Sequence, residues 1–225
     1  MAETGVISKK GICVHHVMFD IDGTLVQSMK LDSECFVNAV SNVLGIAIDI
    51  NWSKYDYVTD SGILYEVLCS IGRENEREEI EYRVKSEFLR LLDNAVTLTP
   101  IKQTEGASNF LAKLKSLKGI TLSIATGGWH ETAQLKLKSA DIDISGIHLS
   151  SSSEHYDRVV IMKLALSKSH AQNQDSVTYF GDGEWDRKAC SKLGYNFVLI
   201  GNKTEHHQKM SDFNDVCTAL GYIGL

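Results

Sequence analysis

The sequence has little proline and no long apolar run. Pro100 is the only proline among its 225 residues. No stretch approaches the roughly 18 uninterrupted apolar residues that a membrane-spanning helix needs. The first ten residues, MAETGVISKK, contain no apolar segment of the kind that a secretory signal peptide carries. We therefore expect a cytoplasmic protein that has no membrane partner.

Cysteine is present, but its pattern indicates no chemistry. The five cysteines are odd in number and widely spaced, and no two of them form the C-x-x-C pair found in zinc and redox sites. We expect them to be reduced and mostly buried. They are Cys13, Cys35, Cys69, Cys190 and Cys217.

Positive charge is also scarce. The formal net charge is −6, and lysine and arginine do not gather in one segment. Nucleic-acid binders depend on basic patches for their affinity, so we expect no nucleic-acid partner. An anionic ligand would need a local cation to neutralise it.

Hydrophobic residues make up 43% of the chain, enough for one full domain with a sizeable core and a smaller insertion. Residues 13–19 (CVHHVMF) form a β-rich run, and a turn follows at 20–24 (DIDGT). From there to Pro100 the pattern is helical. Apolar residues recur at helical spacing around 36–44, 63–71 and 80–92, and Gly45 and Gly72 follow the first two segments. The segment therefore predicts three helices.

After Pro100, helices and strands alternate. Strands are predicted at 120–125, 144–149, 177–180 and 196–200. Helices are predicted at about 110–117, 129–139, 158–170 and 187–193. This alternation is typical of a parallel sheet with right-handed crossovers. The sequence thus predicts an α/β fold with a helical insertion.

Polar residues follow several of the predicted strands. Asp20 and Asp22 follow the first strand, Thr126 follows the second, and Asp182 and Asp186 follow a later one. Ligands of an open parallel sheet bind outside the carboxyl ends of its strands, so these separate loops should converge on one site.

The Asp20–Asp22 pair also has simpler interpretations. Aspartates often shape turns and cap helices. A calcium loop of the EF-hand type is excluded by spacing, because counting from Asp20 places Leu25 where glycine is required and Leu31 where the bidentate glutamate belongs.

The hexapeptide FDIDGT, directly after a β run, resembles the first signature of the haloacid dehalogenase-like hydrolase superfamily. The segment 123–127 (SIATG) resembles the second signature, and 179–186 (YFGDGEWD) resembles the fourth. The resemblance extends across the whole chain. It implies a Rossmann-like three-layer core of residues 1–27 and 101–225, with residues 28–100 forming a helical cap of the C1 type.

The resemblance implies a role for each acidic residue. Asp20 would attack the phosphoryl group as a covalent nucleophile, and Asp22 would act as general acid and base. The expected metal ligands are the carboxylates of Asp20 and Asp182 and the backbone carbonyl of Asp22. Asp186 is either a direct or water-mediated ligand, or a helix-start aspartate that accepts from backbone donors. Because these donors are all hard oxygens, the expected ion is Mg²⁺.

Phosphate binding is expected at the same edge of the sheet. By the resemblance, Gly23, the Thr126 hydroxyl and the Gly127 amide would hold phosphate oxygens, the last two at a helix N-terminus. The third signature is a basic residue that neutralises charge on the phosphoryl oxygens. Arg158 is favoured because it lies at the start of its predicted helix. Lys163 and Lys168, further along the helix, are the alternatives.

The implied activity is a Mg²⁺-dependent phosphatase that acts on a small phosphorylated metabolite, as a monomer or homodimer. A phosphomutase retains both aspartates and is the alternative, and a non-catalytic phosphate-binding regulator is a third. Dehalogenases and phosphonatases of the superfamily lack the second aspartate, so Asp22 disfavours both.

A few other residues leave open interpretations. His15 and His16 would face opposite sides of a strand and could not chelate one ion together. His206 and His207 lie in a polar segment. Trp129 and Trp185 follow two site loops and would either form the rim of the site or pack helix starts. The segment 55–62 (YDYVTDSG) would either cap a helix or contact substrate.

Overall fold

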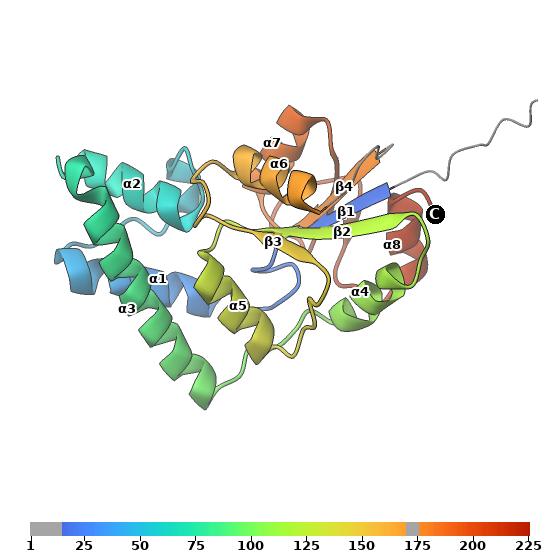
Figure 1. Ribbon diagram of the computed structural model, residues 1–225, viewed down its shortest axis with the longest axis horizontal. Helices are drawn as coiled ribbons and strands as arrows, with labels where there is room; N and C mark the ends of the chain where they lie inside the picture. Colours follow the sequence, from blue (N-terminus) through green and yellow to red (C-terminus); the bar gives the residue numbers. More distant parts are fainter. Residues whose placement is uncertain (1–14, 170–175) are drawn as a thin grey trace, which may run out of the picture.

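The computed structural model describes residues 15–169 and 176–225. Its centre is a parallel sheet of six strands in the order β3-β2-β1-β4-β5-β6 (Figure 1). β1 lies between β2 and β4, so its carboxyl end opens at the middle of the sheet. The strands are β1 (His15–Phe19), β2 (Ile120–Ala125), β3 (His148–Ser150), β4 (Ser176–Gly181), β5 (Asn196–Ile200) and β6 (Lys209–Met210).

Helices cover both faces of the sheet. Met18 and Tyr179 point to one face and pack with residues of α6 and α7. Phe19 and Phe180, one residue further along the same strands, point to the opposite face and pack with α4, α5 and α8. Three layers result, as the α/β pattern predicts. The helices are α4 (Ala107–Lys115), α5 (His130–Ser139), α6 (Arg158–Lys168), α7 (Glu184–Leu193) and α8 (Val216–Tyr222).

The segment between β1 and α4 is helical and forms a separate layer, on the left in Figure 1. The chain leaves and re-enters the sheet through adjacent linkers, since the Gln27 amide donates to the Lys102 carbonyl at 2.9 Å and the Thr104 amide donates to the Leu25 carbonyl at 2.9 Å. The helices are α1 (Met29–Leu44), α2 (Asp60–Ser70) and α3 (Arg77–Leu98), with short 3₁₀ turns at Trp52–Lys54 and Glu74–Glu76.

Most sequence-based expectations for these elements are confirmed. Gly45 ends α1 in the left-handed conformation that only glycine adopts freely, at φ 70°. The predicted strand at 144–149 is shorter than expected, because residues before His148 form a turn. β6 and α8 were not predicted, since both are short and carry weak patterns. None of the described helices is long and apolar enough to cross a bilayer. Cys13 and residues 170–175 lie outside the described residues.

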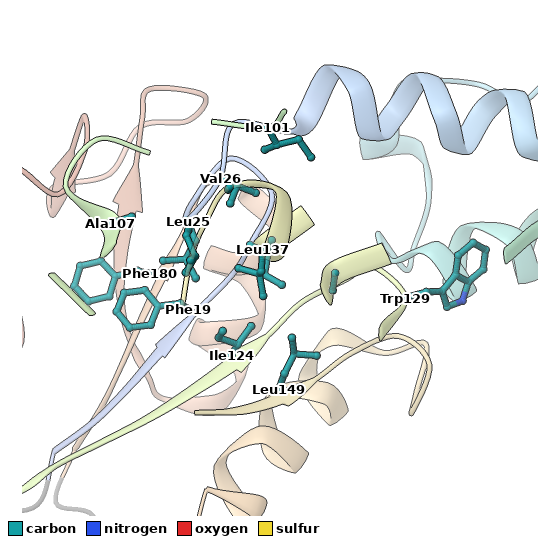
Figure 2. Close-up of a cluster of buried hydrophobic side chains, with 14 of the residues drawn as sticks. Phe19, Leu25, Val26, Ile101, Ala107, Ile124, Trp129, Leu137, Leu149 and Phe180 are labelled. Carbon is teal, nitrogen blue, oxygen red and sulfur yellow. The ribbon is translucent and has the colours of Figure 1, made fainter. Parts of the chain in front are cut away.

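Four phenylalanines support the sheet beneath its site edge (Figure 2 labels two of them). Phe19 and Phe180, on neighbouring strands, stack with ring centroids 5.1 Å apart. Phe110 of α4 meets Phe180 edge-on at 5.7 Å, and Phe213 stacks on Phe110 at 5.3 Å. All four rings are buried. Such aromatic contacts add to the free energy gained by burial.

We expect Phe180→Ala to lower the free energy of unfolding by about 3–5 kcal/mol, because it leaves a cavity among these rings. Tyr82→Ala is the matched control, since Tyr82 is 70% exposed. Urea titration of both variants measures the difference. A Phe180→Ala protein as stable as Tyr82→Ala would contradict this description of the core.

Candidate active site

Asp20 and Asp22 lie in the turn that follows β1. The Asp20 amide donates to the Phe180 carbonyl of β4 at 2.9 Å, which continues the strand pairing by one residue. The chain then turns sharply at Gly23, where φ is +79°. A side chain at Gly23 would collide with the Asp182 carboxylate. Glycine therefore allows the β1 turn to pack closely against the loop that follows β4.

Asp20, Asp182 and Asp186 form a buried acidic cluster. One carboxylate oxygen from each lies within 4.8 Å of the others, an arrangement that could hold a metal ion. Within the described part of the chain, no hydrogen-bond donor reaches Asp20 Oδ1 or Asp182 Oδ1, although both atoms are buried. Buried carboxylate oxygens are costly when they lack a partner, so the cluster is suited to a bound cation.

The electrostatics of the cluster support this view. Burial, and secondarily the charge of Asp186, raise the pKa of Asp20 to about 7. Burial raises the pKa of Asp182 to about 6, and it raises the pKa of Asp186 as well. A divalent cation would reverse these shifts, because it stabilises the ionised carboxylates.

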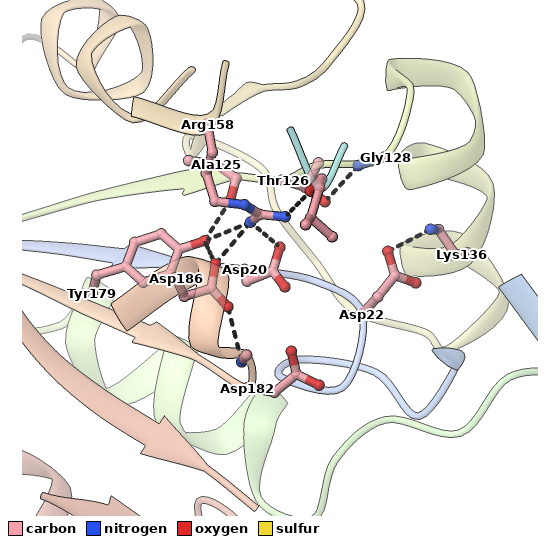
Figure 3. Close-up of polar contacts among 12 residues, drawn as sticks. Asp20, Asp22, Ala125, Thr126, Gly128, Lys136, Arg158, Tyr179, Asp182 and Asp186 are labelled. Atoms are coloured by element: carbon pink, nitrogen blue, oxygen red, sulfur yellow. Dashed lines mark hydrogen bonds and ion pairs between the residues drawn. The ribbon is translucent and has the colours of Figure 1, made fainter. Parts of the chain in front are cut away.

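Arg158 reaches the cluster from the first residue of α6 (Figure 3). Its Nη1 lies 2.8 Å from Asp186 Oδ1 and 3.6 Å from Asp20 Oδ1. Its Nη2 donates to the carbonyl of Val58, in the helical segment, at 3.1 Å. Burial alone would lower the pKa of Arg158, but the negative charge of Asp186 raises it overall, so the guanidinium stays charged. Lys163, the alternative from the sequence, is exposed.

Asp186 is fully engaged by its neighbours. Its Oδ2 accepts from the Gly183 amide at 3.1 Å, which caps the start of α7. Its Oδ1 accepts from Arg158 and, at 3.3 Å, from the Tyr179 hydroxyl. The side chain therefore acts as a helix-start aspartate and orients Arg158. One of its oxygens also lies within 4.8 Å of oxygens of Asp20 and Asp182, so Asp186 is one of three residues that could hold a metal ion.

Thr126 and Gly127 follow β2, as the sequence predicts, and both line the same cavity. A Cβ atom at Gly127 would collide with the guanidinium of Arg158, so glycine leaves room for Arg158 in its present position. The Thr126 hydroxyl accepts from the Gly128 amide at 3.3 Å. Helix α5 begins three residues after Gly127, at His130.

Asp22 points away from the acidic cluster. Figure 3 shows its carboxylate turned toward Lys136 of α5, whose Nζ lies 2.5 Å from Asp22 Oδ2. The Ser28 hydroxyl donates to the other oxygen of Asp22. Lys136 is fully buried and also contacts Asp32 Oδ1 of α1 at 2.7 Å. Lys136 therefore joins the β1 turn to the helical segment.

Lys136 was not predicted as a site residue, because the segment 136–138 (KLK) is typical of an exposed, charged helix surface. The spacing of the neighbouring apolar residues did indicate burial, however. Lys136 continues the apolar spacing of Trp129, Ala133, Leu137 and Ala140, all of which are buried. A lysine on such a stripe indicates a buried ion pair. Lys203, in the loop after β5, was also missed, and its Nζ pairs with Asp182 Oδ2. Nothing in its local sequence distinguishes it.

The helical segment completes the site through Asp60 at the start of α2. The Asp60 amide donates to the Gly127 carbonyl at 2.8 Å, and Asp60 Oδ2 accepts from the Trp129 amide at 2.9 Å. Burial raises the pKa of Asp60 well above its usual value, and it raises the pKa of Asp32 to about 6. Both carboxyl groups lie close to Lys136, which contributes positive charge.

A cavity of about 70 Å³ lies between the sheet edge and the helical segment. From the core it is lined by Asp20, Asp22, Thr126, Gly127, Gly128, Arg158, Asp182 and Trp185. From residues 29–63 it is lined by Met29, Asp32, Ser33, Phe36, Trp52, Val58, Thr59, Asp60 and Ile63. The loops after three strands thus meet at one cavity, as their order in the sequence predicts.

The remaining open interpretations are resolved by position. Trp129 packs a helix start, since its indole N–H donates to Ser61 Oγ at 2.8 Å and the side chain is buried. Trp185 lines the cavity. In the segment 55–62, Thr59 caps α2, which confirms the capping role, and Thr59 also lines the cavity, where substrate contact stays a prediction. His15 and His16 hydrogen-bond to opposite neighbouring strands, so neither faces the site.

Comparison with known proteins identifies the family. The family model of haloacid dehalogenase-like hydrolases matches residues 14–194, most of the chain. The chain belongs to the haloacid dehalogenase-like hydrolases. No curated protein matches it in sequence. The family assignment explains why an acidic cluster of this kind lies at the carboxyl end of β1, since members of this family usually use a metal ion.

Solved structures share the fold of this haloacid dehalogenase-like hydrolase at low sequence identity. CbbY from Rhodobacter sphaeroides, in complex with phosphate, has a TM-score of 0.70 at 15% identity, covering 94% of this chain and 100% of that one. A CbbY variant in complex with xylulose-1,5-bisphosphate has a TM-score of 0.66 at 15% identity, covering 90% and 96%. β-Phosphoglucomutase from Clostridium difficile has a TM-score of 0.72 at 13% identity, covering 94% and 97%.

We expect Lys136→Met to lower the free energy of unfolding by about 3–5 kcal/mol, because removing one partner leaves buried carboxylates without a counter-charge. Lys138→Met, on the exposed side of the same helix, is the matched control. Thermal unfolding of the two variants gives the comparison. Equal stability would show that Lys136 is not needed to balance Asp22 and Asp32.

Proposed function

We propose that this hydrolase is a Mg²⁺-dependent phosphatase that acts on a small phosphorylated metabolite through an aspartyl-phosphate at Asp20. The observation that carries the proposal is the pair of buried oxygens, Asp20 Oδ1 and Asp182 Oδ1, which accept no hydrogen bond from the described residues and lie beside the charged Arg158. A carboxylate that must attack phosphorus cannot be tied up by hydrogen bonds. The family assignment supports hydrolysis as the reaction class.

The position of Asp20 supports its role as the nucleophile. It lies at the carboxyl end of the central strand, buried, with Arg158 Nη1 3.6 Å from its Oδ1. Arg158, the Thr126 hydroxyl and the Gly127 amide are suited to hold the phosphoryl oxygens, because all three line the cavity beside Asp20. Attack would form the Asp20–phosphorus bond and break the bond to the leaving oxygen, so that hydrolysis proceeds in two steps.

Asp22 would supply the proton to the leaving oxygen and later remove one from the attacking water. It is two residues from Asp20 but is held away from it by Ser28 and Lys136. A rotation of the side chain toward Asp20 is therefore part of the proposed mechanism. Ser28 and Lys136 would define its resting position.

The acidic cluster would hold Mg²⁺ through the carboxylates of Asp20 and Asp182 and the backbone carbonyl of Asp22, with Asp186 beside them. The bound ion would supply positive charge against the phosphoryl oxygens and keep Asp20 ionised. Lys203 pairs with Asp182 Oδ2, so Asp182 Oδ1, which accepts no hydrogen bond from the described residues, would be available to the ion.

Residues 28–100 would act as a cap over this site. Val58, Thr59 and Asp60 of the segment line the cavity, and the Val58 carbonyl accepts from Arg158 at 3.1 Å. Closing such a cap excludes water and limits the size of the substrate. The substrate would therefore be a small phosphorylated metabolite rather than a phosphoprotein. The phosphate bound to CbbY is consistent with this class of ligand.

A phosphomutase of the same superfamily is the second candidate, because the β-phosphoglucomutase from Clostridium difficile shares the fold across 94% of this chain. Incubation with sugar phosphates distinguishes the two. Phosphate release supports the phosphatase, whereas interconversion of isomers without net release supports the mutase.

We expect Asp20→Asn to reduce Mg²⁺-dependent release of phosphate from an aryl phosphate by at least about 10³-fold, because the amide is not a nucleophile. Asp93→Asn, at an exposed position of α3, is the matched control and should retain full activity. Undiminished turnover by Asp20→Asn, or no turnover by the wild-type protein on aryl phosphates, sugar phosphates, nucleotides and phosphoglycolate, would reject the phosphatase.

We expect stabilisation by Mg²⁺ to grow as the pH rises. The raised pKa values, about 7 for Asp20 and about 6 for Asp182, mean that the metal-free protein loses stability as the pH rises from about 4 to 7. In that window the unfolded chain releases protons that the folded protein keeps. Saturating Mg²⁺ should raise the midpoint of thermal unfolding by about 5–10 °C at pH 7.5.

The same measurement at pH 5.5 should give a much smaller increase, because the ligands are protonated and bind the ion weakly. Asp182→Asn should show a reduced increase at both pH values, while Asp93→Asn behaves as the wild type. If Mg²⁺ raised the unfolding midpoint of Asp182→Asn as much as that of the wild-type protein, the ion would have to bind at another site.

A further inference from the structure

The cavity has two chemically different ends. Arg158 and Thr126 mark the end beside Asp20, where Asp20 Oδ1 and Asp182 Oδ1 accept no hydrogen bond from the described residues. The phosphoryl group belongs at this end. The leaving group of the substrate must then extend away from Arg158, toward the part of the cavity that α1 lines.

The second end combines aromatic and acidic side chains. Phe36 and Trp52 meet there edge-on, with ring centroids 6.2 Å apart. Asp32 lies one helical turn before Phe36 on the same face of α1, and Asp32, Ser33 and Asp60 also line the cavity. The aromatic rings offer contact to an apolar or ring-shaped group, while the carboxyl groups accept hydrogen bonds.

No basic side chain among the described lining residues serves this second end. Arg158 is the one basic residue that lines the cavity in the described part of the chain, and it is bound to Asp186 at the phosphoryl end. Lys136, behind the wall, contacts the carboxylates of both Asp22 and Asp32, so a single positive charge faces two acidic groups. A second anionic group on the substrate would find like charge and no free cation.

We propose that Asp32 makes this end of the cavity select substrates by charge: it accepts a neutral or cationic leaving group that can donate hydrogen bonds and rejects one with a second phosphate or a carboxylate. The inference rests on the proposed phosphatase function and narrows its substrate class. The single charge of Lys136 cannot balance both carboxylates that it contacts, so a further anion brought beside Asp32 would meet uncompensated negative charge, and such like-charge contacts are unfavourable.

The fold by itself does not impose this selection. A CbbY variant of the same fold was solved with xylulose-1,5-bisphosphate. Selection in this protein therefore depends on the side chains that line its own cavity, in particular on Asp32 and the absence of a basic residue at neighbouring positions such as Ser33.

Three aryl phosphates that differ only in the charge of a para substituent test the proposal. They are para-ethylphenyl phosphate, tyramine O-phosphate and para-(carboxyethyl)phenyl phosphate, whose reacting phosphoester is the same. We expect the kcat/KM of the wild-type protein with Mg²⁺ to be lower for the carboxylate ester than for the other two by on the order of tenfold or more.

Two substitutions locate the effect. Asp32→Asn should reduce the discrimination against the carboxylate ester. Because Asp32 contacts the buried Lys136, its substitution also removes an ion pair, so a second variant that adds a charge and leaves this pair intact is needed. Ser33→Lys adds a cation to the same wall and should raise the kcat/KM for the carboxylate ester, relative to the ethylphenyl ester, by about tenfold. Ser33→Gln, of similar length but neutral, should leave this ratio unchanged.

The outcomes separate the two proposals. Equal kcat/KM values for the three esters, or a ratio that Ser33→Lys does not change, would overturn charge selection and leave the phosphatase intact. Failure of the wild-type protein to hydrolyse any of the three esters would count against the phosphatase itself, and the substrate class inferred from it would fall with it.

Discussion

Concentrated negative charge at the carboxyl end of the central strand is the constraint on which the rest of the structure depends. Asp20, Asp182 and Asp186 bring their carboxylates within 4.8 Å of one another in a buried setting. Arg158 compensates part of this charge from α6 and Lys203 from the loop after β5. The compensation is incomplete, since the pKa of Asp20 is still raised to about 7. The site is thus built to gain stability from a cation.

Several features of the fold follow from this constraint. The close approach of the β1 turn to the β4 loop requires glycine at position 23, and glycine at position 127 leaves room for the guanidinium of Arg158 beside the β2 loop. The aromatic layer of Phe19, Phe180 and their neighbours lies directly beneath and holds the two central strands in register. A rigid core on one side allows the acidic groups to stay close despite their mutual repulsion.

The helical segment is tied to the same charges. Lys136 connects Asp22 of the core to Asp32 of α1, and Arg158 binds the Val58 carbonyl before α2. Any movement of the helical segment relative to the sheet would break these contacts. Such movement would therefore change the contacts that orient Asp22.

The elements that place the site could be predicted from the sequence, whereas the network around Asp22 could not. Strands that end in FDIDGT and YFGDG, and glycines that stop helices, are local patterns, and residues 120–125 form a strand with the predicted bounds. Lys136 and Asp32 are 104 residues apart and meet only after folding. From the sequence alone a lysine is expected at the surface, because the carboxylates that balance its charge in the core cannot be identified. β6 has only two residues, which is too short to show the alternation of apolar and polar residues from which a strand is predicted.

The central claim, that Asp20 carries the phosphoryl group, is most directly tested by chemical trapping. In an Asp22→Asn variant, an aryl phosphate with a good leaving group should still phosphorylate Asp20, while removal of the phosphoryl group by water slows. Borohydride reduction followed by peptide mass spectrometry should then find homoserine at position 20, only when substrate and Mg²⁺ are both present. Phosphate release without any reduced residue at position 20, or reduction at a different aspartate, would contradict the account.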